Sequence, residues 1–330
     1  MSCERARAGL AILALALLAA LVPALAATAQ TPRVYRIGAV LLGGPYAAAL
    51  QGLREGLREQ GFEEGKQYTL IVRDTKGDAK AVETAARELE RDNVDLLYTV
   101  ATSVTLSAKR ATTRVPIVFN AGSDPIALGL VESYRKPGGR LTGVHSQLAD
   151  LTAKRLELLK EVVPGVRRVL AFYTPENPAS QQAVKSAREA AQQLKIELVE
   201  RPVRSTEELR AALTAVRPGE FGALFYIASA LVTSQTDAII EIARQKKLPT
   251  MFQEPDSINK GALAAYGSSY RAAGHLSAKH VRRVLQGTPP GEIPVEQVSK
   301  PYLALNLKTA KAIGLTVPHP VVMRADEIIQ

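Results

Sequence analysis

Strand-like and helix-like patterns alternate along this chain and do so twice in the same order. Apolar strand patterns begin at residues 34, 68 and 94, and similar ones begin at 167, 196 and 222. Segments with apolar residues at helical spacing lie between them, at 46–57 and 79–91 in the first half and at 178–194 and 206–216 in the second. In the first half, a helix pattern at 103–112 and a strand pattern at 115–119 follow. Such alternation predicts an α/β fold of two doubly wound, mainly parallel sheets, each forming one lobe with helices on both faces.

The connections between the halves predict a hinge. A strand pattern at 140–146 follows Pro137-Gly138-Gly139, which we interpret as scaffold, and leads to a helix at 151–163. Further elements are predicted at 262–267, 271–285, 293–299 and 307–313. We expect residues 30–143 plus about 268–290 in an N-terminal lobe, and 144–267 plus about 300–330 in a C-terminal lobe. Several hinge crossovers would then border an interlobe cleft.

The first 29 residues have the pattern of a cleavable signal peptide. Arg5 and Arg7 precede an apolar run at 9–22, and two A-x-A cleavage sites end at Ala26 and Ala29. The alternative is a membrane anchor, but the apolar run is short for a stable span. We therefore expect a periplasmic protein, cleaved after Ala26 or Ala29.

The charge and cysteine content indicate which partners and cofactors to expect. The net charge is +10, but the basic residues are scattered along helices, which is typical of solvated faces and does not predict nucleic acid binding. Cys3 is the only cysteine and precedes the apolar run, so the mature chain would hold neither a disulfide nor a cysteine metal site. We expect no cofactor and no metal.

Catalytic motifs are not found in the sequence. The four histidines form no H-E-x-x-H pattern, and there is no G-x-S-x-G, G-x-x-x-x-G-K or G-x-G-x-x-G. Glu176, in Thr-Pro-Glu-Asn-Pro, has no partner carboxylate of the kind that glycosidases use. We therefore do not expect an enzyme.

Small polar residues follow the predicted strands and are the candidate ligand contacts. Helix N-termini at these positions offer N–H groups to an anion, although Ser, Thr, Asp and Asn are also ordinary helix caps. Five such loops in two facing lobes favour a ligand. They contain Gly44 and Tyr46, Thr102 and Ser103, Ser123 and Asp124, Asn177, and Ser229.

Four stretches resemble the periplasmic solute-binding proteins of ABC transporters, in the group of tryptophan- and tyrosine-type binders. They are GLREGLREQGFEEGKQYTL, VPIVFNAGSDPIALGLVESYRKPGGRLTGV, KRLELLKEVVPGVRRVLAFYTPENPAS and LNLKTAKAIGLTVP. The resemblance covers nearly all of the mature chain and implies a type I periplasmic binding protein fold. It also implies that Thr102 and Ser103 donate to a ligand carboxylate beside Ser123 and Asp124, with Tyr173 and Asn177 contributed by the second lobe.

One departure from the resemblance concerns a ligand ammonium. Many relatives carry an acid just after the strand that ends here at Tyr226-Ile227, but this chain has Ala228-Ser229-Ala230. A buried ammonium needs a charge partner, and Asp124, Glu254 or Asp256 could replace that acid. Tyr46, Tyr226, Tyr266 and Tyr270 could stack on a ligand or could be core residues.

The sequence thus predicts a monomeric solute-binding protein that closes on a small organic ligand, such as an amino acid or another carboxylate, and delivers it to an ABC permease. Three alternatives stay open: the same fold as a sensor that presents its ligand to a receptor, a sugar-binding protein, and a secreted small-molecule hydrolase.

Overall fold

The structure is a computed structural model that describes residues 33–146, 148, 150–227, 229–298 and 300–330. The predicted signal peptide, residues 1–29, lies outside the described residues. Residues 35–330 form one unit, and the description below concerns that unit alone.

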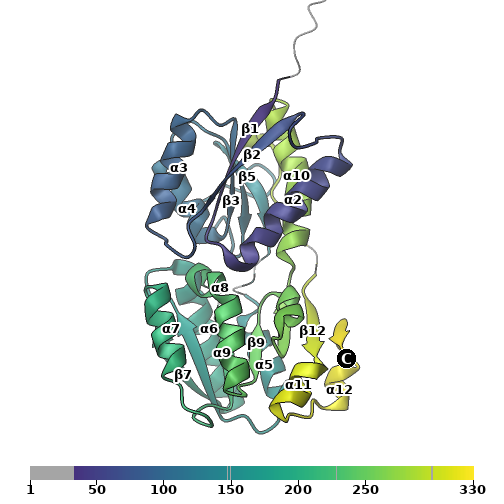
Figure 1. The fold of residues 1–330 in the computed structure, drawn as a ribbon. Coiled ribbons are helices and arrows are strands. Elements are labelled where there is room, and N and C mark those ends of the chain that lie inside the picture. The colour runs from purple at the N-terminus through teal and green to yellow at the C-terminus, as the bar shows by residue number, and fades with distance from the viewer. Residues whose placement is uncertain (1–32, 147, 149, 228, 299) are drawn as a thin grey trace, which may run out of the picture. The chain divides into compact units, whose positions relative to one another are not determined.

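The first sheet has six strands in the order β11-β5-β4-β3-β1-β2, all pairing in parallel. Its strands are β1 (Tyr35–Leu41), β2 (Tyr68–Asp74), β3 (Leu96–Val100), β4 (Ile117–Ala121), β5 (Leu141–His145) and β11 (Glu296–Gln297). Helices α2 (Ala47–Glu59) and α10 (Tyr270–Leu285) pack together beside it, and α3 (Ala81–Arg91) packs with α4 (Thr102–Ala111) on its other side (Figure 1). We call this sheet with its helices lobe 1.

Glycines bring α2 and α10 into close contact. A Cβ on Gly274 would lie 1.9 Å from the carbonyl oxygen of Ala49, and one on Gly52 would lie 1.9 Å from that of Arg271. Only glycine allows the two backbones to approach this closely. A helix from late in the chain is thereby fixed to lobe 1, and its first residue, Tyr270, reaches the site described below.

The second sheet has seven strands in the order β13-β12-β10-β9-β8-β6-β7. They are β6 (Arg168–Tyr173), β7 (Glu197–Pro202), β8 (Ala223–Tyr226), β9 (Thr250–Phe252), β10 (Ala264–Gly267), β12 (Tyr302–Asn306) and β13 (Glu327–Ile329). All neighbours pair in parallel except β10 and β12, which are antiparallel. We call this sheet with its helices lobe 2.

Strand alternation divides lobe 2 into two cores. Val169 and Ala171 of β6 pack into a cluster with α5 (Thr152–Val162) and α6 (Pro178–Leu194), whereas Leu170 and Phe172 face α7 (Thr206–Thr214) and α9 (Thr236–Gln245). Successive side chains of a strand point to opposite faces, so this sheet is covered on both sides. The remaining helical segments among the described residues are η2 (Gly44–Tyr46), α8 (Ala230–Ser234), η3 (Pro255–Lys260), η4 (Pro290–Glu292), α11 (Leu307–Ile313) and α12 (His319–Val322).

The predicted fold class is confirmed: there are two doubly wound, mainly parallel sheets with helices. Helices α6 and α11 have the predicted bounds. The sequence patterns did not predict α9, β9, β12 or β13, and β9 proves important for the site. Within the described residues, no helix has both the length and the apolarity needed to cross a membrane.

Candidate functional site

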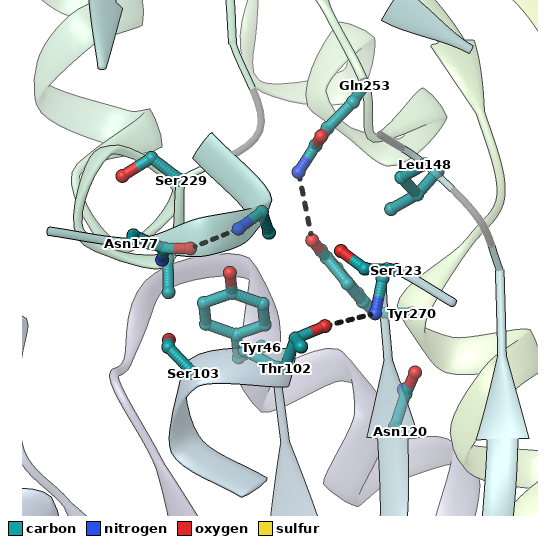
Figure 2. Close-up of a pocket in the computed structure, with 14 residues that line it drawn as sticks. Tyr46, Thr102, Ser103, Asn120, Ser123, Leu148, Asn177, Ser229, Gln253 and Tyr270 are labelled. Carbon is teal, nitrogen blue, oxygen red and sulfur yellow. Dashed lines mark hydrogen bonds between the residues drawn. The ribbon is translucent and has the colours of Figure 1, made fainter. Parts of the chain in front are cut away.

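The carboxyl ends of strands from both lobes surround one pocket of about 410 Å³ of space free of protein atoms, some of it open to solvent (Figure 2). Fourteen residues line it: Tyr46, Ala101, Thr102, Ser103, Asn120, Gly122, Ser123, Leu148, Asn177, Ala179, Ser229, Ala230, Gln253 and Tyr270. None of these fourteen carries a charged side chain. The wall therefore offers hydrogen bonds and two aromatic rings, and it has no charge of its own.

The structure brings six of the ten predicted site residues to this pocket: Tyr46, Thr102, Ser103, Ser123, Asn177 and Ser229. Two of them also cap helices. Asn177 Oδ1 accepts from the Ala179 and Ser180 amides at 3.0 and 3.3 Å. Ser229 Oγ lies 2.7 Å from Thr174 Oγ1 and accepts from the Val232 amide. That the six bind a ligand stays a prediction.

The other four predicted residues lie outside the pocket wall. Gly44 packs against the backbone of Ser234, where a Cβ would come within 2.6 Å of the carbonyl oxygen. Asp124 Oδ1 accepts from the Ile126 amide at 2.8 Å and the Tyr134 hydroxyl at 2.9 Å, so this carboxylate caps its own loop. Tyr173 and Tyr266 are half-buried against the core of lobe 2.

The lobe 1 side of the pocket is a hydrogen-bond donor wall, made by the start of α4 and the end of β4. No side chain of the described residues caps α4, and the first N–H groups of a helix have no partner within the helix. Thr102 Oγ1 accepts from the Gly122 amide at 3.1 Å, which fixes the β4 loop against the helix start. Asn120 is 3% exposed, and its Nδ2 has no hydrogen-bond partner within the described chain.

Ala101, immediately before α4, has a strained backbone, with φ 93° and ψ 145°. An L residue rarely adopts a positive φ, because its Cβ approaches the neighbouring carbonyl oxygen, and such strain costs about 1–3 kcal/mol. Its amide is held by the Asn120 carbonyl at 2.9 Å. The strained turn leaves the helix start uncapped at the pocket. An uncapped N-terminus with its positive dipole end is suited to a carboxylate.

The lobe 2 side carries acceptor groups at the end of β9. Gln253 follows this strand, and its Nε2 donates to Glu254 Oε1 at 2.9 Å and contacts Tyr270 Oη at 3.2 Å. Gln253 Oε1 and Glu254 Oε2 have no partner among the described residues, although Gln253 is 3% exposed and Glu254 1%. Figure 2 places Gln253 across the pocket from Asn120 and Ser103.

Burial dominates the electrostatics of this acceptor end. It raises the pKa of Glu254 to about 7, against hydrogen bonds and the Arg155 charge that lower it. Burial also lowers the pKa of Arg155 to about 10 and raises those of Tyr46 and Tyr270. The rings of Tyr46 and Tyr270 are tilted at 57° with centroids 4.9 Å apart.

Sequence reasoning missed Asn120 and Gln253. Asn120 stands at the end of a strand that was predicted, so the strand-end rule that singled out Ser123 could have included it. Gln253 follows the unpredicted β9, and no sequence signal marked it. Tyr270 was named only as one of four tyrosines that could stack.

A wider groove adjoins the pocket and shares Ser103, Asn177 and Ala230 with it. It encloses about 2190 Å³, including open solvent. Its charged residues are of both signs: Lys76, Asp78, Lys80, Glu83, Arg110, Glu176, Arg204 and Glu207. We interpret the groove as the entrance to the pocket.

Among the described residues, no group of three or more histidine, cysteine, aspartate or glutamate side chains is placed to hold a metal ion.

Residues 37–329 match the family model described as ABC transporter substrate binding protein. The chain belongs to this family. Families of this kind bind small molecules outside the cytoplasm for an ABC permease, and they are solute-binding proteins, not enzymes.

Individual proteins are similar to this chain in sequence or in fold. The chain is 27% identical over 267 residues to the tyrosine-binding protein of Clostridioides difficile (strain R20291), covering 81% of this chain and 76% of that one. A crystal structure of a conserved domain protein from Vibrio cholerae matches with a TM-score of 0.80 and 26% identity, over 90% of this chain and 100% of that one. An ABC domain from Streptococcus pneumoniae in complex with L-Trp has the same fold, with a TM-score of 0.79, 24% identity and the same coverage.

Proposed function

We propose that this protein is the periplasmic binding component of an ABC importer and closes on a small organic carboxylate between its two lobes. The observation that carries the proposal is the donor wall: the uncapped start of α4, together with the unpartnered Asn120 Nδ2, faces an uncharged pocket. Buried donors without partners are costly, because each loses its hydrogen bonds to water. A carboxylate would satisfy several of them at once.

The ring pair and the relatives favour an aromatic amino acid. Tyr46 and Tyr270 line the pocket beside the donor wall, and aromatic rings packed edge to face contribute about 0.5–1.5 kcal/mol beyond the area that they bury. The relative from Clostridioides difficile is called tyrosine-binding, and the structure from Streptococcus pneumoniae holds L-Trp. We infer that L-tyrosine or L-tryptophan, or a close analogue, occupies the pocket of this chain.

In this proposal, Thr102 fixes the donor wall, while Ser103, Asn120 and Ser123 contact the carboxylate. Asn177 and Ser229 close the lobe 2 side. The chain acts as a monomer that presents its closed form to a permease.

Export requires removal of residues 1–26 or 1–29, so the exported chain should begin at residue 27 or 30. N-terminal sequencing that finds residue 1 retained would contradict export by a cleaved signal peptide.

Titration calorimetry on ligand-free protein tests the function. We expect saturable one-to-one binding of L-tyrosine or L-tryptophan, with the compound recovered unchanged by chromatography. Failure of every carboxylate in a panel of amino acids and their deaminated analogues to bind would contradict the proposal. Turnover of the bound compound at about 1 s⁻¹ or faster would show an enzyme instead.

A further inference from the structure

The acceptor groups at the end of β9 have no role in holding a carboxylate. Gln253 Oε1 and Glu254 Oε2 both lack a hydrogen-bond partner within the described chain, and both are almost fully buried. A carboxylate ligand would be repelled by them. The pocket therefore has two chemically opposite ends, and the acceptor end requires a ligand group that donates hydrogen bonds.

Glu254 is the acid best placed to supply charge to this end. Asp124 is occupied by its own loop and by Tyr134, and Asp256 Oδ2 accepts from Ser269 Oγ at 3.0 Å. Glu254 Oε1, by contrast, is bonded to two groups of the pocket wall, Gln253 Nε2 at 2.9 Å and the Tyr270 hydroxyl at 3.3 Å. Its other oxygen is unused.

The fold holds Glu254 in this position. β9 ends at Phe252, and Pro255 opens η3, so Gln253 and Glu254 form a short turn at the carboxyl end of the strand. β10 packs tightly behind that turn, because a Cβ on Gly267 would lie 1.9 Å from the Gln253 carbonyl oxygen. This close approach fixes the backbone from which both side chains extend.

A purely structural explanation is that Glu254 neutralises Arg155, a fully buried guanidinium on α5. The hydrogen bonds do not support a direct pair. Arg155 donates to the Leu148 carbonyl at 2.8 Å and to Thr152 Oγ1 at 3.0 Å, and its Nε has no partner among the described residues. Arg155 thus holds the crossover that carries Leu148 into the pocket, while Glu254 is bonded to the pocket wall.

We propose that Glu254, acting through Gln253 and Tyr270, makes the lobe 2 end of the pocket a subsite for a protonated nitrogen, so that the ligand carries an ammonium as well as a carboxylate. This inference rests on the proposed function and adds a specificity-determining residue to it. An ammonium has three donors: Gln253 Oε1 accepts one, and the Tyr270 oxygen accepts another while its own proton goes to Glu254. Glu254 supplies the negative charge that a buried ammonium needs.

The surroundings of Glu254 suit this role. The charged and titratable groups that face it are Arg155 from α5, Tyr46 from η2, Tyr226 from β8 and Tyr270 from α10. Without a ligand, burial leaves the pKa of Glu254 at about 7. An arriving cation would favour the ionised form and lower that pKa.

Paired probes test the subsite. Each pair differs only in the ammonium group: L-tyrosine and 3-(4-hydroxyphenyl)propanoate, L-tryptophan and 3-(indol-3-yl)propanoate, L-phenylalanine and 3-phenylpropanoate, L-leucine and 4-methylpentanoate. Affinities are measured by calorimetry for the wild type, for Glu254→Gln, and for Asp256→Asn as the matched control. Asp256→Asn removes one negative charge two residues away, from an acid that does not line the pocket.

We expect the wild type to bind the amino acid of at least one pair about tenfold or more tightly than its deaminated partner, the range for a charged hydrogen bond. Glu254→Gln should lose this preference, and its affinity for the deaminated acid should stay within about threefold of the wild-type value. Asp256→Asn should keep the preference. A wild type that binds the acids without preferring the amine overturns the subsite and leaves the proposed function intact. Binding of no carboxylate at all overturns both.

The pH dependence of the wild type gives a second measurement that does not depend on a variant folding. Between pH 8 and pH 5.5 the probe ammonium and carboxylate keep their charges, while Glu254 gains a proton. The preference for the amino acid should fall across this range. A preference that is constant with pH, or an equal loss of affinity for both members of each pair in Glu254→Gln, would show that Glu254 has only a structural role.

Discussion

The two walls of the pocket are built in different ways. The lobe 1 wall is made of backbone N–H groups at a helix start and of short side chains held by the β4 loop. The lobe 2 wall carries Gln253 at the end of a three-residue strand, bonded to Glu254 behind it and to Tyr270 of α10. The first wall provides donors, whereas the second provides acceptors and lies against the carboxyl of Glu254, whose pKa burial raises to about 7. One wall should thus be insensitive to pH and the other sensitive to it.

The largest expected effect comes from reversing the charge preference of the donor wall. Ser103→Glu places a carboxylate at the start of α4, where it suits the helix dipole and should not lower the melting temperature. It would repel a ligand carboxylate, and like charges in such a site cost several kcal/mol, which is more than about a hundredfold in affinity. Calorimetry with L-tyrosine and L-tryptophan checks this.

The matched control is Ser107→Glu, on the same helix but in the outer groove. It should change affinity little. Equal losses in both variants would mean that the general charge of α4 matters and that its first turn has no special role.

The acceptor wall should make stability depend on pH. Because burial raises the pKa of Glu254 from 4.5 to about 7, the folded state holds this proton more tightly than the unfolded state does. That contribution is fully present below about pH 4.5 and is lost as pH rises to about 7. Its upper limit is about 3–4 kcal/mol, at about 1.4 kcal/mol per pKa unit.

Denaturant unfolding of ligand-free protein at several pH values measures this effect. Relative to Glu254→Gln, the wild type should lose stability between pH 5 and pH 8, and saturating L-tyrosine should reduce that loss. If stability changes with pH in the same way in both proteins, Glu254 does not titrate in this pH range.

The smallest effect is expected at Asp124, which the sequence placed in the cleft. Its carboxylate accepts from the Ile126 amide and from Tyr134, and Asn caps a turn about as well as Asp does. Asp124→Asn should therefore leave ligand affinity within about twofold. A loss of tenfold or more in calorimetry would mean that Asp124 reaches the ligand after all, and that the acceptor wall extends into lobe 1.

The donor wall could be predicted largely from sequence, because its position depends on local pattern. VDLLYTV (94–100) and VPIVF (115–119) have the pattern of buried strands, and the residues that follow parallel strands meet at one edge of the fold. Ser103 and Ser123 were found in this way. Asp124 shows the limit of the rule, because a polar residue at a strand end can accept hydrogen bonds within its own loop instead of contacting a ligand.

The acceptor wall could not be predicted in the same way. β9 has only three residues and owes its identity to pairing with β8 and β10, so Gln253 carried no local signal. Glu254 was one of three possible acids, and only its hydrogen bonds to Gln253 and Tyr270 single it out. Likewise, Tyr266 and Tyr270 are four residues apart, but the first lies in a strand against the lobe 2 core and the second at a helix start in the pocket.

A crystal structure of the protein with L-tryptophan or L-tyrosine, whichever binds more tightly, tests the polarity of the pocket most directly. We expect the ligand carboxylate within hydrogen-bond distance of the α4 N-terminal amides or Asn120 Nδ2. We expect the ammonium within the same distance of Gln253 Oε1 or the Tyr270 oxygen, with Glu254 behind them. A ligand bound in the reverse orientation, or with its ammonium paired to an acid other than Glu254, would contradict this polarity.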